Sequence, residues 1–233
     1  MNARFREGLR HGVPIALGYF SVAIGFGIMA ANAGLTIAEA VAISLSNLTS
    51  AGQVAGVGII AAGGTAFEMA LTQFVINLRY SLMGISLSQK LDEKFHTPQR
   101  ITAAFGITDE IFAVCSAYPG RLTPAYMYGV ILVAAAGWGS GTFVGAAMGE
   151  LLPPVLTDAL GIMLYGMFLA VFIPAAREDR GTLVVVLIAA GLSVLFNYVF
   201  TVVSGGFAII LCAVAAAALG AWLFPAKDEE VAE

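Results

Sequence analysis

Apolar residues occur along the chain in long stretches, separated by short polar or charged connections. A transmembrane helix needs about 20 mostly apolar residues. Charges, prolines and glycine pairs divide the sequence into segments of that length. These predicted segments lie near 13–33, 38–62, 65–89, 100–119, 123–149, 154–175, 181–203 and 205–225. The longest polar stretch, QKLDEKFHTPQR (89–100), separates the first three segments from the rest.

The composition indicates which solvent surrounds these segments. Hydrophobic residues make up 59% of the chain and charged residues only 11%, whereas soluble domains carry about 25% charged residues. So few charges could not cover a water-facing surface. We therefore expect a chain embedded in a lipid bilayer, as an all-α, polytopic membrane helical bundle of about seven to eight segments. Residues 1–12 would form a cytoplasmic N-terminus, 13–225 a single transmembrane domain with a retained first helix, and 226–233 an acidic tail.

Two of the predicted segments are interrupted by polar or glycine-rich stretches. The second contains SLSNLTSAGQVAGVG (44–58) and the fifth contains GWGSG (137–141). Each is the middle member of a triplet, 13–89 or 100–175, with extra helices in 181–225. Broken helices at matching positions of two inverted halves indicate a transporter site near the bilayer midplane. We predict such an inverted 3+3 repeat. Sequence similarity between the halves is faint, and a bundle without a repeat is the alternative.

The second segment is the first candidate for a substrate site. Unwound backbone inside a membrane is tolerated only around a cavity, and a half-helix N-terminus carries partial positive charge that suits a carboxylate. The polar and small residues that would surround it are Ser46, Asn47, Thr49, Ser50, Gly52 and Gln53. A close helix contact through Gly52 and Gly56 is the alternative.

Glycines recur every four residues in the fifth segment. They are Gly137, Gly141, Gly145 and Gly149. Such a pattern is mainly a close-packing face between membrane helices. Only the stretch 138–140 suggests an interruption there.

Arg79 stands in the middle of an apolar run, QFVINLRYSLMGIS (73–86). A charge at mid-bilayer costs at least about 2.5–3.5 kcal/mol, so such residues face the bundle interior and have a partner. The acids at the same depth are Asp109 and Glu110. Because adjacent helical residues point about 100° apart, we predict that one acid pairs with Arg79 and the other faces the pathway, where it could carry a coupling proton. A purely structural ion pair is the alternative.

Two further polar residues are candidates for lining the same cavity. Asn77 belongs to a polar stripe at helical spacing on the Arg79 segment, and Tyr19 lies in the first segment. Hydrogen bonding between helices, worth about 0.6 kcal/mol per bond on average, is the alternative for the stripe.

Other classes of function find little support in the sequence. The few Lys and Arg residues lie singly or at segment ends, so no nucleic-acid partner is expected. His11 and His96 do not assemble into a metal set, and no cofactor is predicted. The motifs of common enzyme classes, such as a Walker loop or HExxH, do not occur. We therefore expect a protein that is not an enzyme.

The orientation depends on whether segment 38–62 crosses the membrane or folds back as a re-entrant hairpin. With eight crossings, three basic residues lie opposite the N-terminus, namely Lys90, Lys94 and Arg100. With a re-entrant hairpin these three join the N-terminus, and Arg121, Arg177, Arg180 and Lys227 lie opposite. Counting positive charges does not decide between these two arrangements.

Three motifs in this chain resemble the AzlC family of branched-chain amino acid exporters. They are GLRHGVPIALGYFSVAIGFGIMAANAGLTIAEAVAISL, INLRYSLMGISLS and GITDEIFAV, in matching order across roughly 8–175. The resemblance implies a multi-pass protein of the bacterial inner membrane that exports hydrophobic amino acids, with a small membrane partner of the AzlD type. The chain departs from the family in the second segment, where LTSAGQV (48–54) lacks flanking aromatic residues.

The leading hypothesis is therefore a proton-coupled, alternating-access exporter of an amino-acid substrate. A passive channel for small solutes is the second hypothesis. A non-transporting subunit of a transport complex is the third.

Overall fold

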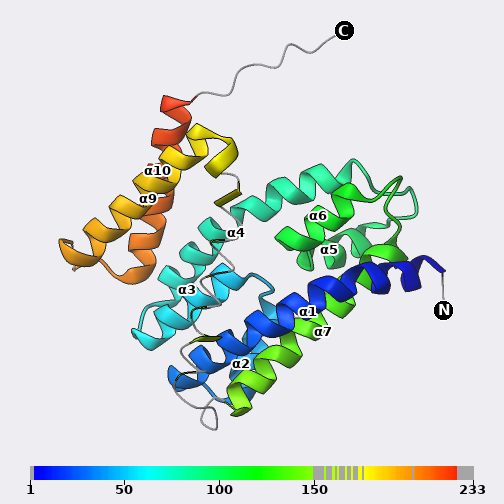
Figure 1. The fold of residues 1–233 in the computed structure, drawn as a ribbon, viewed down its shortest axis with the longest axis horizontal. Helices are drawn as coiled ribbons and strands as arrows, with labels where there is room; N and C mark the ends of the chain where they lie inside the picture. The colour runs from blue at the N-terminus through cyan, green and yellow to red at the C-terminus, as the bar shows by residue number, and fades with distance from the viewer. Residues whose placement is uncertain are drawn as a thin grey trace. The chain divides into compact units, whose positions relative to one another are not determined.

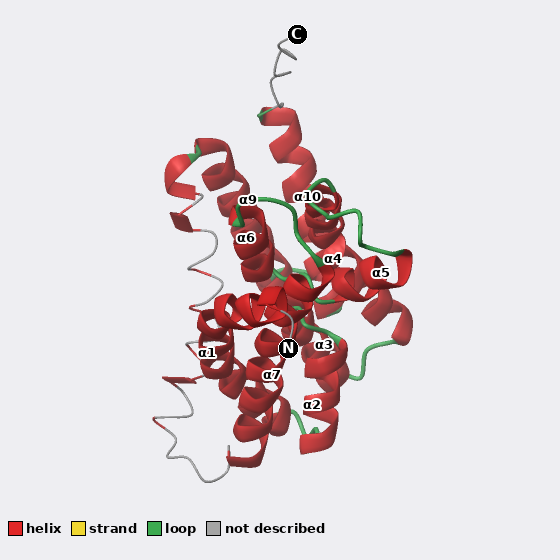
Figure 2. Cartoon of the chain, turned by 90° about the vertical axis from the view of Figure 1, so that its right-hand side faces the viewer, coloured by secondary structure: helices red, strands yellow, loops and turns green. Residues whose placement is uncertain are grey.

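The computed structural model describes residues 3–148, 176–200 and 202–224, with single positions between 155 and 174. Over these residues the chain forms helices and loops and no strand (Figure 2). The predicted segment near 154–175 and the acidic tail lie outside the continuously described part. The helices are α1 (Ala3–Asn32), α2 (Ile37–Ser46), α3 (Ser50–Ala61), α4 (Ala66–Ser88), α5 (Thr97–Phe105), α6 (Asp109–Ala117), α7 (Pro124–Met148), α9 (Arg180–Tyr198) and α10 (Gly205–Leu223).

The predicted fold class, an all-α membrane helical bundle, is confirmed. Four described helices are long and apolar enough to cross a membrane, namely α1, α7, α9 and α10. They correspond to predicted segments 13–33, 123–149, 181–203 and 205–225. α1 begins ten residues earlier than predicted, because the amphipathic N-terminal stretch continues the helix. The segments 38–62 and 100–119 each form two short helices instead of one.

The chain divides into two compact units. The first comprises residues 1–57 and 76–165, and the second comprises residues 58–75 and 166–233. In the second unit α9 packs against α10. Asp179 caps α9 by accepting the Thr182 N–H at 2.6 Å. The buried carboxylate of Glu68 accepts the Gly206 N–H at 3.0 Å, at the start of α10.

In the first unit α1 and α7 lie side by side along their length (Figure 1). Glycines on each helix contact the backbone of the other. A Cβ atom added to Gly137 would lie 2.4 Å from the Ala16 carbonyl oxygen, and one on Gly141 would lie 2.3 Å from that of Phe20. The residue numbers of the contacting pairs rise in the same direction on both helices, so α1 and α7 run parallel.

This contact decides the role of the glycines in α7. The predicted close-packing face is confirmed, because Gly137, Gly141 and Gly145 all sit against α1 backbone. The predicted interruption at 137–141 is wrong, since α7 is continuous through it. Ser140 bonds back to its own helix, at the Ala136 carbonyl oxygen.

The second predicted segment is interrupted where the sequence indicated, at residues 47–49 between α2 and α3. The chain folds back there. Gln53 Nε2 on α3 donates to Ser44 Oγ on α2 at 2.9 Å. Val57 near the end of α3 joins Ala40 near the start of α2 in one apolar cluster. Residues 37–61 therefore form a hairpin of two half-length helices.

The predicted single span at 100–119 is wrong, because it too is a hairpin, with its break at 106–108 between α5 and α6. The Asp92 N–H donates to the Leu122 carbonyl oxygen, and the Leu122 N–H donates to that of Lys90, both at 2.8 Å. The hairpin thus begins and ends at the same place. Thr108 causes the restart of the helix, since its side chain caps α6 by accepting the Ile111 N–H.

The two hairpins enter the first unit from opposite ends. Arg4, Asp92 and Lys94 line one pocket at the N-terminal end, and the α5/α6 hairpin starts there. The α2/α3 hairpin starts at the other end, where Ala40 packs against Ala30 near the end of α1. Helix plus hairpin therefore occurs twice in opposite directions, as α1 with α2/α3 and α4 with α5/α6.

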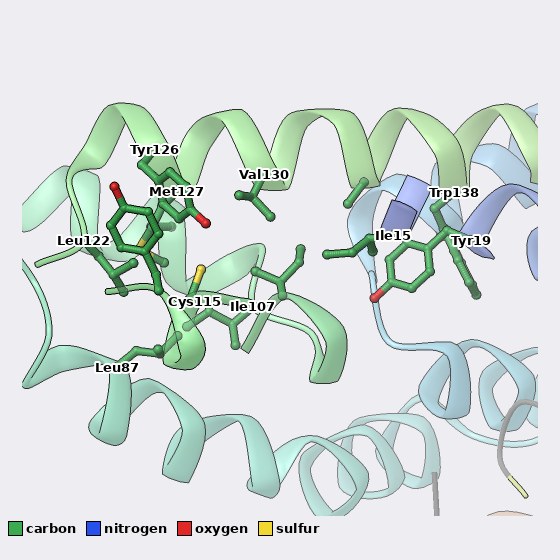
Figure 3. Packing of buried hydrophobic residues seen from close by; sticks show 14 of the residues in the cluster. Ile15, Tyr19, Leu87, Ile107, Cys115, Leu122, Tyr126, Met127, Val130 and Trp138 are labelled. Atoms are coloured by element: carbon green, nitrogen blue, oxygen red, sulfur yellow. The ribbon is translucent and has the colours of Figure 1, made fainter. Parts of the chain in front are cut away.

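The tips of the hairpins meet in the apolar core of this unit. Leu48 from one tip packs against the buried cluster that contains Ile107 from the other. Figure 3 shows this cluster along α7, from Leu122 and Tyr126 at one end to Trp138 and Tyr19 at the other. Polar groups at the two tips are consequently held close together inside a mainly apolar unit.

Both orientations considered from the sequence separated Arg121 from Lys94, and the structure places them at the same end. Arg121 Nη1 donates to the Leu91 carbonyl oxygen at 3.1 Å. The reason is the α5/α6 hairpin, which returns the chain to its starting end instead of crossing.

Candidate functional site

An ion pair joins α4 to the first turn of α6. Arg79 Nη2 lies 3.0 Å from Asp109 Oδ2, and the side chains remain 38% and 26% exposed. The same guanidinium nitrogen lies 3.0 Å from the Tyr80 hydroxyl. Its carbon lies 4.9 Å from the centroid of the Tyr80 ring, within the range of a cation–π contact. Of the two acids that the sequence offered, Asp109 is the one that pairs with Arg79.

Tyr80 connects this ion pair to the broken α2/α3 hairpin. Its hydroxyl lies 3.5 Å from Asp109 Oδ2 and also hydrogen-bonds with the side chain of Thr49. Thr49 is buried and immediately precedes α3. The two hairpin tips are therefore bridged by one phenol ring from α4.

Glu110, the second acid, has a different set of partners. The Tyr19 hydroxyl from α1 donates to the Glu110 carboxylate and lies 2.6 Å from Thr108 Oγ1. The Tyr19 ring packs edge-on against Trp138 of α7 at 5.1 Å. In Figure 3 its hydroxyl points away from α7. Glu110 thus lies between the α6 N-terminus and the α1/α7 pair.

The short helix α6 explains why two adjacent acids can occupy these places. Asp109 and Glu110 form its first turn, where the helix dipole stabilises negative charge by about 0.3–1 kcal/mol each. Adjacent helical residues diverge by about 100°, so the two acids contact different neighbours. At the C-terminal end of α6, Lys90 Nζ donates to the carbonyl oxygens of Ser116 at 2.6 Å and Tyr118 at 2.7 Å.

The structure brings together five of the site residues predicted from the sequence. They are Tyr19, Thr49, Arg79, Asp109 and Glu110. We call these five, with Tyr80 and Thr108, the tip cluster.

Four other predicted residues lie near the tips. Asn47 ends α2, and Ser50 and the buried Gly52 begin α3. Asn77 is half-buried on α4, two residues before Arg79. Their predicted role in lining a site remains a prediction.

Two predicted residues lie apart from the tip cluster. Ser46 is exposed and donates to the Ala42 carbonyl oxygen of its own helix at 2.6 Å. Gln53 is fully buried against Ser44, whose hydroxyl lies 2.6 Å from Thr142 Oγ1 on α7. These hydrogen bonds link the α2/α3 hairpin to α7, so Gln53 contributes to packing between helices.

Sequence reasoning missed Tyr80, Thr108 and Trp138. Tyr80 lies outside the polar stripe of α4, so its spacing gives no signal of a site. Thr108 carried a usable signal, since a threonine followed directly by two acids is a typical helix start. Trp138 gave no such signal, because only the packing of α1 on α7 brings it to Tyr19.

The tip cluster can hold a small zwitterion. Arg79 offers hydrogen-bond donors to a carboxylate, and the two acids offer acceptors to an ammonium group. Within the described residues no three His, Cys, Asp or Glu side chains converge to hold a metal ion.

Comparison with known proteins gives relatives over nearly the whole chain. The chain is 28% identical to the inner membrane protein YgaZ of Escherichia coli (strain K12) over 237 residues, covering 98% of this chain and 95% of that protein. It is 28% identical over 223 residues to an uncharacterized membrane protein of Archaeoglobus fulgidus, covering 95% and 96%. It is 25% identical over 150 residues to one of Helicobacter pylori (strain J99), covering 63% and 64%. No solved structure matches.

The profile of the AzlC protein family matches residues 14–152. This range holds α1 from Pro14 onward, both hairpins, α4 and all of α7, and so includes every residue of the tip cluster. It covers more than half of the 233 residues. The chain therefore belongs to the AzlC family.

Proposed function

We propose that the protein is a secondary active exporter of branched-chain or other hydrophobic amino acids, coupled to protons and working by alternating access. Membership of the AzlC family and the membrane-protein relatives support a role in membrane transport. The observation that carries the finer proposal is the Arg79–Asp109 ion pair at the meeting point of two oppositely directed broken hairpins. Broken helices at the centre of inverted elements are a common setting for a transporter's substrate site.

The tip cluster supplies a partner for each charged group of an amino acid. The substrate carboxylate binds Arg79 or the amide groups at the start of α3, where the helix dipole is positive. The substrate ammonium binds Asp109. Glu110 lies beside Tyr19 rather than in the ion pair, and it serves as the site of the coupling proton.

We place the protein in the bacterial inner membrane as a multi-pass chain, with a small AzlD-type membrane subunit as partner. The membrane location is supported by YgaZ, a relative named as an inner membrane protein. The partner is part of the proposal and is what the family resemblance implies. The partner can be supplied or withheld in the transport assay.

The test is efflux of radiolabelled valine from loaded proteoliposomes, with and without a pH gradient and with and without the companion subunit. We expect saturable efflux that the gradient accelerates. Asp109→Asn and Arg79→Ala should each reduce efflux at least about tenfold, because hydrogen bonds to charged groups contribute about 1.5–3 kcal/mol. Glu110→Gln should remove the effect of the gradient.

Glu39→Gln provides the matched control. Glu39 is an exposed acid in the capping box at the start of α2, and glutamine can replace glutamate in that box. Its efflux should equal that of the wild type. Efflux that neither saturates nor responds to the gradient would identify a passive channel. The proposal would be contradicted if this chain showed no binding and no efflux, both alone and with the companion subunit.

A further inference from the structure

A cavity of about 480 Å³ lies between α4 and α5 in the first unit. Pockets for small ligands are typically about 300–1,000 Å³ and mainly apolar. Apolar side chains form most of this wall, among them Ile85, Leu87, Phe95, Ala103, Ile107 and Met127. The size and the wall suit a small molecule with an apolar group.

The cavity connects the tip cluster with the N-terminal end of the unit. Its inner end is lined by Tyr80, which contacts both members of the ion pair. Its outer end is lined by Ser88 and Arg100. Ser88 follows Tyr80 by eight positions on α4, a distance of about 12 Å along the helix. Arg79 and Asp109 therefore lie one side chain beyond the inner end of the cavity.

The chemistry of the wall restricts the class of ligand. A sugar or other strongly polar solute would lose hydrogen bonds to water without replacement along an apolar wall. An aliphatic side chain gains about 0.8 kcal/mol for each methylene that it buries. The cavity therefore favours a ligand with a charged head at the tip cluster and an aliphatic tail along α4.

We propose that this cavity binds the aliphatic side chain of the exported amino acid, which enters from the N-terminal end. The inference rests on the proposed function and adds the determinant of substrate size. The α-amino and α-carboxylate groups then lie at Asp109 and Arg79, and the side chain passes Tyr80 into the cavity.

Gly84 is the position at which cavity size is set. It lines the cavity, and a Cβ atom added there meets no atom within 4 Å. A larger side chain at this position therefore fills the cavity without displacing a neighbour. Gly18 on α1 is the matched control, because it is also free of contacts within 4 Å and does not line the cavity.

The first experiment compares leucine and alanine efflux by the wild type, Gly84→Leu and Gly18→Leu. Removing space for one methylene in an apolar pocket changes discrimination by roughly 10–200-fold. We therefore expect Gly84→Leu to reduce the preference for leucine over alanine at least about tenfold. Gly18→Leu should keep the wild-type preference. An unchanged preference in a Gly84→Leu protein that still transports would overturn the inference.

The second experiment measures binding without transport. Gly84→Cys is labelled with a water-soluble maleimide in the presence of leucine or glycine. The native cysteines, Cys115 and Cys212, are buried and should react slowly. We expect leucine, but not glycine, to slow labelling several-fold.

The outcomes separate this inference from the proposed function. If leucine slows labelling of Gly84→Cys but no amino acid is exported, export is contradicted and the cavity remains a binding site. Efflux of leucine without protection of the introduced cysteine would keep export and overturn the cavity assignment. Protection by a fatty acid instead of leucine would assign the cavity to a lipid chain and overturn the inference.

Discussion

Arg79 lies inside an apolar unit with oxygen atoms from α6 and from its own helix around its guanidinium group. Asp109 supplies an ion pair and Tyr80 supplies both a hydroxyl and a ring face. Both charged side chains are also partly exposed, so neither is fully desolvated. The local arrangement thus lowers the penalty of a charge in the membrane interior and leaves it accessible to a solute.

Tyr19 offers a test of the same cluster at the scale of one hydroxyl group. Tyr19→Phe removes the donor to Glu110 and leaves the buried Thr108 with one partner fewer. A lost buried hydrogen bond costs about 1–3 kcal/mol. We expect the variant to unfold at a lower temperature, measured by the thermal unfolding of purified protein in detergent.

Tyr198→Phe is the control for this substitution, because Tyr198 is 76% exposed. Its unfolding temperature should match that of the wild type. Equal unfolding temperatures for Tyr19→Phe and the wild type would show that the Tyr19 hydroxyl does not hold the cluster together.

At the scale of elements, the parallel α1–α7 pair is the scaffold on which both hairpins rest. Glycines on α7 let the α1 backbone approach closely, because they carry no Cβ atom at the contact. The α2/α3 hairpin is tied to α7 through Ser44 and Thr142. The α5/α6 hairpin is tied to α1 through Tyr19. The spacing between α1 and α7 therefore decides where the hairpin tips meet.

Gly141→Ala tests this spacing. The added Cβ atom would lie 2.3 Å from the Phe20 carbonyl oxygen, so the two helices must separate. Overpacking of this kind costs about 1–3 kcal/mol. We expect a lower unfolding temperature and weaker valine efflux. Gly18→Ala, which meets no atom within 4 Å, should change neither quantity.

At the scale of the whole molecule, the basic residues of the first unit other than Arg79 gather at one end. They belong to the N-terminal stretch, the 89–100 stretch and the loop between α6 and α7. These residues are Arg4, Arg6, Arg10, Lys90, Lys94, Arg100 and Arg121. No Lys or Arg occurs between residues 33 and 65, which include the opposite end. Cytoplasmic loops carry the excess of Lys and Arg, so we expect the N-terminal end to be cytoplasmic.

Accessibility of introduced cysteines tests this orientation. A membrane-impermeant maleimide added to intact cells should label Asn32→Cys at the far end of α1 and leave Lys94→Cys unlabelled. Inside-out vesicles should give the reverse pattern. Labelling of both positions from the same side would place the two ends of the first unit on one side of the membrane. That result would contradict two hairpins that enter from opposite ends.

Sequence alone was sufficient for the features that depend on local composition. Low charge and long apolar stretches determined a helical membrane protein, because hydrocarbon admits only segments that satisfy their own backbone. The polar stretch at 44–58 indicated one interruption, which the structure places at 47–49. The isolated charge of Arg79 required a partner at equal depth, and only Asp109 and Glu110 were available in the next segment.

Tertiary structure decided the features that depend on contacts between distant residues. Hydropathy does not tell whether a broken helix continues across the bilayer or folds back, because that choice depends on Ser44 meeting Gln53 and Leu91 meeting Leu122. The glycines at 137–141 could mark either a break or a contact, and only the neighbouring α1 made them a contact. Which acid faces Arg79, and that Tyr80 bridges both hairpin tips, followed from packing rather than from the order of residues along the chain.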